Sequence, residues 1–158
     1  MGKNSVFAIE AFAQMLKPGG RLLGLDVGSK TIGLALSDAT RSVATPLSTI
    51  KRTKFTKDAA QLSEVIEAHD ISALIIGLPL NMDGSEGPRA QSVRAFARNL
   101  AMHVSLPVAF WDERLSTAAA ERTLLEADAS RKRRGEVIDK MAAAIILQGA
   151  LDRLRNLG

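Results

Sequence analysis

Residues 22–38 constrain the fold most strongly, because they consist of two short apolar runs joined by a small polar turn. Bulky apolar residues alternate with small or polar residues along both runs, which predicts a β-hairpin connected at residues 28–31. The expected cross-strand pairs are Val27 with Ile32, Leu25 with Leu34, and Asp26 with Gly33. One face of the hairpin is then bulky, while the other is small and carries the carboxylate of Asp26. Because small residues let another backbone approach closely, we expect a later element to press on this face and bring partners to Asp26.

The rest of the chain alternates between helix and strand patterns. A helix is expected over residues 4–16, and a third strand over residues 42–50, where Pro46 requires a sheet edge or a bulge. The later elements expected are a helix over 56–69, a strand over 72–77, a helix from Pro88, a strand over 107–111, a helix from Ser116 or Thr117 to about Asp128, and a last helix over about 136–156. Antiparallel strands followed by strands that alternate with helices predict an α/β fold, a mixed five-stranded sheet with helices on both faces. We expect one domain over residues 21–158, preceded by an N-terminal helical extension over residues 1–20.

Composition limits the class of protein. The 158 residues are 46% hydrophobic and 24% charged, which is typical of a single globular domain. The chain has no cysteine, so disulfides and thiolate metal sites are excluded. It has no membrane-spanning apolar run and no signal-type start, so we expect a cytoplasmic protein with no membrane partner. The net charge of +4 favours an anionic partner. On charge alone, a basic enzyme of small metabolites is the alternative.

Acidic residues follow strands that should meet at one edge of the sheet. Asp26 ends the first strand, and Asp112 and Glu113 follow the fifth. Ligands bind beyond the carboxyl ends of the strands in such sheets. Asp139 lies in the last helix on a stripe that contains Ala142, Ala143 and Ile146, and packing this stripe on the small face of the hairpin would bring Asp139 to Asp26.

Each of these acids also has a simpler interpretation. Asp26 could accept hydrogen bonds from the amides of the turn at residues 28–31. Glu113 could be a partner of Arg114, and the pattern does not separate Glu113 from Asp112. Asp139 could interact with the helix dipole. Their convergence favours a shared site.

Three carboxylates in one pocket repel one another unless cations bind or their pKa values rise. Oxygen ligands without cysteine or a histidine motif fit Mg²⁺ or Mn²⁺ better than Zn²⁺. Two such ions about 4 Å apart would hold the attacking and leaving oxygens of a phosphodiester. A basic protein with an acidic metal site is most simply a nuclease.

Basic residues near these acids are candidates for binding nucleic acid. Four adjacent charges precede Asp139 in an expected short loop between helices, namely Arg131, Lys132, Arg133 and Arg134. Lys30 follows Asp26 in the hairpin turn, and Arg114 follows Glu113. A solubilising surface loop is the alternative for residues 131–134. Aromatic residues are only 4% of the chain, with no tyrosine, so we expect contacts to the nucleic-acid backbone rather than stacking on bases.

Four ordered segments, residues 25–38, 77–84, 112–117 and 139–148, resemble the YqgF/RuvX family. The resemblance extends from about Arg21 to Leu154. It implies an RNase H-like fold related to Holliday junction resolvases of the RuvC type, and a divalent-metal phosphodiesterase whose acids correspond to Asp26, Glu113 and Asp139. Members of the family are described as nucleases that mature the 5′ end of pre-16S rRNA, and earlier as Holliday junction resolvases.

The favoured substrate is therefore structured RNA such as pre-16S rRNA, with branched DNA as the alternative. The protein would act as a monomer or a homodimer, and cutting a junction symmetrically would require the dimer. A nucleic-acid binder without catalytic activity is a second class. ATP binding is a third, because the hairpin also resembles the phosphate-binding hairpin of actin-like and sugar-kinase ATPases, but those proteins need two such domains.

Overall fold

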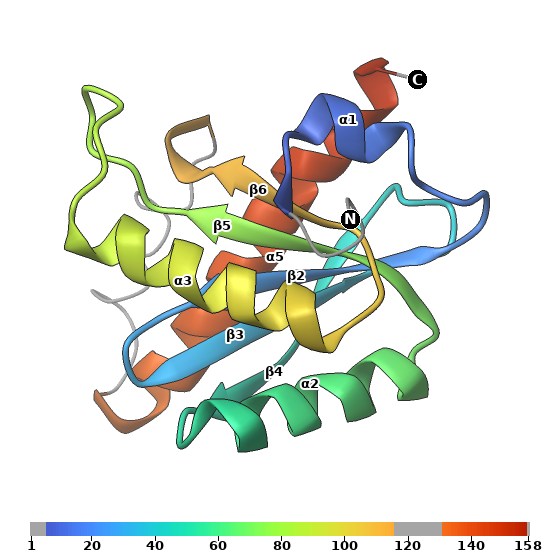
Figure 1. The fold of residues 1–158 in the computed structure, drawn as a ribbon. Coiled ribbons are helices and arrows are strands. Elements are labelled where there is room, and N and C mark those ends of the chain that lie inside the picture. Colours follow the sequence, from blue (N-terminus) through green and yellow to red (C-terminus); the bar gives the residue numbers. More distant parts are fainter. Residues whose placement is uncertain (1–5, 116–130, 158) are drawn as a thin grey trace.

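The computed structural model describes residues 6–115 and 131–157, with side chains described for 6–115 and 140–157. The strands are β1 (Val6–Phe7), β2 (Arg21–Val27), β3 (Thr31–Ser37), β4 (Ala44–Lys51), β5 (Ile71–Leu78) and β6 (Val108–Asp112). The helices are α1 (Ile9–Ala13), α2 (Phe55–Ala68), α3 (Pro88–His103), the short 3₁₀ helix η2 (Glu113–Leu115) and α5 (Arg131–Leu157). The strands form one sheet in the order β1-β6-β5-β2-β3-β4 (Figure 1).

The hairpin of β2 and β3 has the register that its alternation predicts. The antiparallel pairs include Leu25 with Leu34, Asp26 with Gly33, and Val27 with Ile32. The strand β4 completes the antiparallel part and lies at the sheet edge, and its register shifts where Pro46 pairs with Ala35. Pro46 therefore lies both on an edge strand and at a register shift, and either position accommodates a residue without an N–H. On the other side of β2, the strands β5, β6 and β1 are parallel.

Helices cover both faces of this sheet, as predicted. Figure 1 shows α2 and α3 on one face and α5 behind the other. The α2/α3 face buries the bulky side of the hairpin, including Leu25 and Leu34, whereas α1 and α5 pack on the opposite face. The small face of the hairpin contacts α5 closely, because a Cβ atom placed on Gly24 would lie 2.7 Å from Cβ of Leu147. The alanine-lined helix is thus the element that presses on the small face.

Three expectations about the elements are wrong. The sheet has six strands rather than five, because Val6 and Phe7 pair in parallel with Val108 and Ala109 of β6. The helix expected over residues 4–16 is accordingly limited to Ile9–Ala13 among the described residues. The last helix begins at Arg131 rather than near residue 136, so the basic residues are helical. Arginine and lysine favour helix, and Gly135 does not interrupt it.

No helix in the described ranges is both long and apolar enough to cross a membrane. The helix expected from residue 116 or 117 to about 128 lies outside the described residues.

Candidate active site

Asp26 is the acid at the centre of the candidate site. It lies near the carboxyl end of β2, and its side chain is only 3% exposed. The guanidinium of Arg89, from the first turn of α3, lies 4.0 Å from its Oδ1. A buried carboxylate favours a cationic neighbour, because burial alone disfavours the charged form. Asp26 therefore lies where cations are attracted.

Gly77 provides space beside Asp26. Leu25 pairs with Ile76 in the parallel register. The next residue of each strand, Asp26 in β2 and Gly77 in β5, therefore lies beside the other near the carboxyl ends of the strands. A Cβ on Gly77 would lie 3.2 Å from Oε2 of Glu113 and 2.5 Å from Cδ1 of Ile146. The carboxylate of Glu113 thus occupies the side of the sheet that faces α5. Glu113, just after β6, and Asp26, near the end of β2, thus both lie beside Gly77.

Asp112 and Glu113, which the sequence did not separate, have different surroundings. The guanidinium of Arg114 donates hydrogen bonds to both carboxylate oxygens of Asp112 at 2.8–3.1 Å, and its backbone N–H also donates to Oδ1. The hydrogen bonds from the Arg114 side chain are the main reason that the pKa of Asp112 lies below its usual value. Asp112 is therefore held by Arg114, while Oε2 of Glu113 is buried beside Gly77.

Arg114 also secures the loop that follows β5. Its Nη1 donates to the carbonyl of Met82 at 3.2 Å, and the hydrogen bond to Asp112 is the main cause that raises the pKa of Arg114. Gly84 in this loop has a φ of 89°, which glycine adopts without strain. The loop acids have local partners, because Asp83 accepts from Ser85 and Glu86 pairs with Arg94. The guanidinium of Arg114 is thus engaged by Asp112 and by the carbonyl of Met82 within the protein.

The turn after Asp26 is fixed by Arg52. Its Nη1 donates to the carbonyl of Gly28 at 2.6 Å, and its backbone N–H donates to the carbonyl of Lys30 at 2.8 Å. The guanidinium also lies 5.2 Å from the centroid of the Phe96 ring, and Asp58 is 3.9 Å from its Nε. These contacts hold the segment that carries Lys30.

A groove of about 600 Å³ runs beside this turn. It is lined by the turn residues, including Lys30, and by the start of α3 with Arg89. Two cationic side chains therefore line a groove next to Asp26. This arrangement suits a phosphate backbone, which is bound mainly through its negative charges.

The third predicted acid, Asp139, lies on α5. Its side chain is outside the described residues, as are those of Arg131, Lys132, Arg133 and Arg134. Its stripe neighbours Ala142, Ala143 and Ile146 are buried. Among the described side chains, no group of three or more Asp, Glu, His or Cys residues is close enough to hold a metal.

The sequence interpretation missed two residues near the site. Arg89 follows Pro88 at the predicted start of a helix, and this position after the β5 loop is the signal that could have placed it at the strand edge. Arg52 belongs to a run of basic residues that is typical of a solvated surface, and nothing local indicates its bond to Gly28.

A family model described as "RuvX: Holliday junction resolvase" matches residues 20–153. The chain belongs to the RuvX family. A relative from Paracoccus denitrificans (strain Pd 1222) is 63% identical over 150 residues, which cover 95% of each chain. One from Ruegeria pomeroyi (strain ATCC 700808 / DSM 15171 / DSS-3) is 62% identical over 94% of this chain and 97% of the relative. Both relatives are named "Putative pre-16S rRNA nuclease".

Solved structures resemble this RuvX-family chain in fold. RuvC of T. thermophilus, in complex with Holliday junction substrate, has a TM-score of 0.52 at 15% identity and covers 85% of this chain and 94% of its own. The yeast mitochondrial Holliday junction resolvase Ydc2 has a TM-score of 0.51 at 12% identity, over 99% and 91% of the two chains. At these identities the likeness establishes a RuvC-like RNase H fold, as the sequence resemblance implied.

Proposed function

We propose that this protein is a divalent-metal-dependent nuclease that acts in the cytoplasm and hydrolyses phosphodiester bonds at the 5′ end of pre-16S rRNA. The observation that carries the proposal is the convergence of Asp26 and Glu113 beside the side-chain-free position of Gly77. The names of the closely similar relatives support the substrate. We propose Asp26, Glu113 and Asp139 as the catalytic acids.

The donor set fits Mg²⁺ or Mn²⁺. Asp26 and Glu113 offer carboxylate oxygens only, which are the ligands that these hard cations prefer. A Cβ on Gly77 would approach the Glu113 carboxylate to 3.2 Å, so glycine keeps the space beside that carboxylate open. In this proposal Asp139, which lies on α5, is the third acid beside Asp26 and Glu113. When bound, one or two such ions activate the attacking water and stabilise the leaving oxygen.

The protein residues around the acids have separate roles in this proposal. Asp26 and Glu113 would hold the cation through their carboxylate oxygens, and the guanidinium of Arg89 lies 4.0 Å from Oδ1 of Asp26. Lys30 and Arg89 bind phosphates of the substrate along the groove beside the turn. Arg52 positions this turn through the carbonyl of Gly28.

Branched DNA is the second candidate substrate. The matching family model is described as a Holliday junction resolvase, and phosphodiester chemistry at two carboxylates is the same for RNA and DNA. Trimming an RNA end needs one copy of the protein, whereas symmetric cutting of a junction needs two.

The test compares cleavage of a pre-16S 5′ leader and a four-way DNA junction in one assay with Mg²⁺ and Mn²⁺. Asp26→Asn and Glu113→Gln should each abolish cleavage, because an amide is a poorer ligand for a hard cation than a carboxylate. Both variants should keep the circular dichroism spectrum of the wild-type protein. Removal of the metal by EDTA should stop cleavage, and added Mn²⁺ should restore it.

Asp112→Asn is the matched control, because it removes the neighbouring carboxylate on the opposite side of the strand end. This variant should retain more cleavage activity than Glu113→Gln. Full activity of Asp26→Asn would disprove the mechanism. Binding of RNA and junctions without cleavage in any divalent metal would instead support a non-catalytic binding protein.

A further inference from the structure

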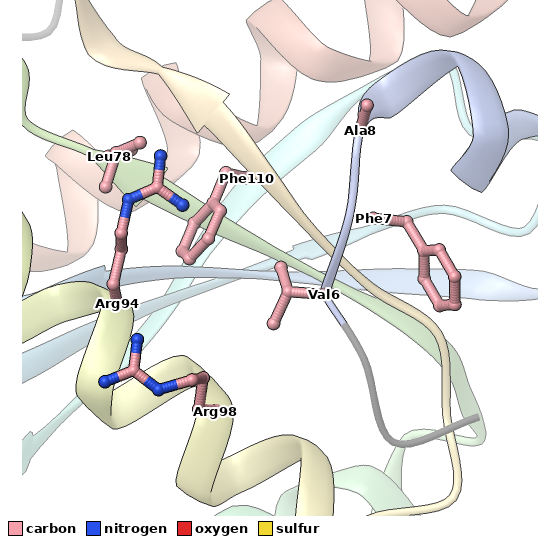
Figure 2. A pocket seen from close by; sticks show the side chains of 7 residues that line it. All are labelled: Val6, Phe7, Ala8, Leu78, Arg94, Arg98 and Phe110. Atoms are coloured by element: carbon pink, nitrogen blue, oxygen red, sulfur yellow. The ribbon is translucent and has the colours of Figure 1, made fainter. Parts of the chain in front are cut away.

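A second cavity lies between β1, β6 and α3, outside the carboxylate site. Its volume is about 560 Å³, within the range of small-molecule sites. Figure 2 shows its walls: Arg94 and Arg98 come from α3, while Val6 and Phe110 come from the neighbouring strands. The other lining residues are Phe7, Ala8 and Leu78. The cavity thus combines cationic and apolar walls.

The two arginines differ in how they are engaged. Arg94 and Arg98 are one turn apart on α3, so they lie on the same side of the helix. Nε of Arg94 donates to both carboxylate oxygens of Glu86 at 2.7 and 2.8 Å, and its guanidinium lies 5.0 Å from the centroid of the Phe110 ring. Arg98 is exposed and forms no ion pair with the described part of the chain. The cavity therefore presents one available cation, that of Arg98.

The apolar wall exists because of the sixth strand. The strand β1 pairs Val6 with Val108 of β6, which places Val6 and Phe7 beside the cavity. Phe110 comes two residues after Val108 and therefore lies on the same face of β6. A ligand that matches these walls needs an apolar planar part and an anionic part. A nucleotide has both, in its base and its phosphate.

The cavity lies near the carboxyl ends of β5 and β6, on the α3 face of the sheet, whereas the Glu113 carboxylate faces α5 at the same edge. Leu78 lines the cavity and directly follows Gly77, the residue beside Glu113. Glu86, the partner of Arg94, belongs to the loop that Arg114 secures at the same edge. A nucleic-acid strand that passes from the carboxylates around this edge of the sheet would reach the cavity.

We propose that the cavity between β1, β6 and α3 binds one unpaired nucleotide of the substrate strand, with its phosphate at Arg98 and its base against Val6 and Phe110. This inference rests on the proposed nuclease function, since it assigns part of the substrate to a second subsite. It gives the N-terminal strand a role in substrate binding. It also adds one base-binding position to a chain that is poor in aromatic residues.

The test is fluorescence anisotropy with a labelled single-stranded RNA and a duplex RNA with the same number of phosphates. The Asp26→Asn background prevents cutting during the measurement. Arg98→Gln should weaken binding of the single strand several-fold and reduce the slope of log K against log salt by about 0.7, the value for one phosphate contact on a single strand. The duplex should be affected less, because its bases are not available to the cavity.

Arg155→Gln is the matched control. Arg155 is an exposed arginine near the end of α5, and its side chain is 55% exposed. The control removes the same charge and should leave binding of the single strand unchanged. Arg98→Lys should recover part of the lost affinity and the salt slope, because it keeps the charge without the planar guanidinium.

Three results would overturn the inference. Equal effects of Arg98→Gln and Arg155→Gln would exclude the cavity from the path of the strand. Equal losses of affinity for the single strand and the duplex in Arg98→Gln would show that the cavity does not bind an unpaired base. Tight binding of a nucleoside monophosphate that Arg98→Gln abolishes, with unchanged strand binding, would identify a site for free nucleotides. Because binding is measured without cleavage, failure of the nuclease proposal would be seen separately in the metal-dependent assay.

Discussion

Gly77 links the packing of α5 to the position of Glu113. Its missing side chain leaves space that Ile146 fills from one side and the Glu113 carboxylate borders from the other. A methyl group there would lie 2.5 Å from Cδ1 of Ile146 and 3.2 Å from Oε2 of Glu113. The end of the isoleucine side chain can move, and the Glu113 carboxylate would have to shift by a few tenths of an ångström from its place beside Gly77.

Gly77→Ala should therefore impair catalysis more than folding. We expect the single-turnover cleavage rate to fall about ten-fold or more, equivalent to about 1.4 kcal/mol in the barrier. The free energy of unfolding should fall by about 1–3 kcal/mol, as is usual when an extra methyl group enters a packed core. Cleavage kinetics and urea denaturation measure the two effects. Substrate affinity in the absence of metal should stay unchanged.

Gly87→Ala provides the matched control for this substitution. A Cβ at Gly87 would meet only the side chain of Asn81, at 3.7 and 3.8 Å, which is ordinary contact. Its cleavage rate should equal that of the wild-type protein. A wild-type rate in Gly77→Ala would show that the close approach of Glu113 to Gly77 has no catalytic importance.

Strand ends explain why the sequence predicts part of the site but not all of it. Asp26 follows an alternating apolar run, so its position and its cross-strand partner follow from the period of two. Asp112 and Glu113 lie where β6 passes into a 3₁₀ helix, and the alternation no longer says which acid faces α5. The bond of Arg52 to Gly28 depends on how α2 and α3 lie over the turn, which no local pattern encodes.

The docking of α5 on the hairpin depends on small residues and on one polar side chain, Gln148. Its Oε1 accepts a hydrogen bond from the N–H of Ala44 at 2.9 Å, and its Nε2 donates to the carbonyl of Ser42 at 3.0 Å and to Asp152 at 3.0 Å. Gln148 thus connects α5 to the beginning of β4, which is separated from β5 by the two strands β2 and β3.

Gln148→Ala should destabilise the protein by about 1–3 kcal/mol, because its two hydrogen bonds to the backbone near the start of β4 are partly buried and each contributes about 1 kcal/mol. Urea denaturation measures the change. Gln91→Ala, an exposed substitution on α3, is the control for the effect of alanine on helix propensity. Equal stability of the two variants would show that Gln148 does not contribute to the docking of α5.

Two element boundaries could not be predicted from local sequence. Val6 and Phe7 fall within the helix predicted over residues 4–16, and only pairing with β6, about a hundred residues later, makes them a strand. At the start of α5, Gly135 and the run of like charges suggest a loop, yet the backbone is helical from Arg131. Helix propensity of arginine and lysine is the competing factor there. By contrast, α3 begins at Pro88 as predicted, because proline at the first helical position is a strong local signal.

The charge of the whole molecule favours nucleic acid, but its distribution decides which surface binds. The formal net charge is +4, and four of the basic residues are adjacent at the first turn of α5, just before Asp139. Positive charge at a helix N-terminus is unfavourable for the helix dipole, so these residues do not stabilise the helix by their charge. We propose that they bind phosphates of the substrate instead.

Replacing Arg131, Lys132, Arg133 and Arg134 by glutamine should weaken RNA binding and flatten its salt dependence. If all four contact phosphates of a single strand, the slope of log K against log salt should fall by about 3, since each contact contributes about 0.7. The control variant replaces Lys17, Arg21, Arg153 and Arg155, which are exposed and belong to other surfaces. Both variants lose four positive charges and therefore go from +4 to zero, so a general effect of net charge would appear equally in both. A slope that changes only in the first variant assigns the contacts to the start of α5, whereas an unchanged slope excludes the start of this helix from the binding surface.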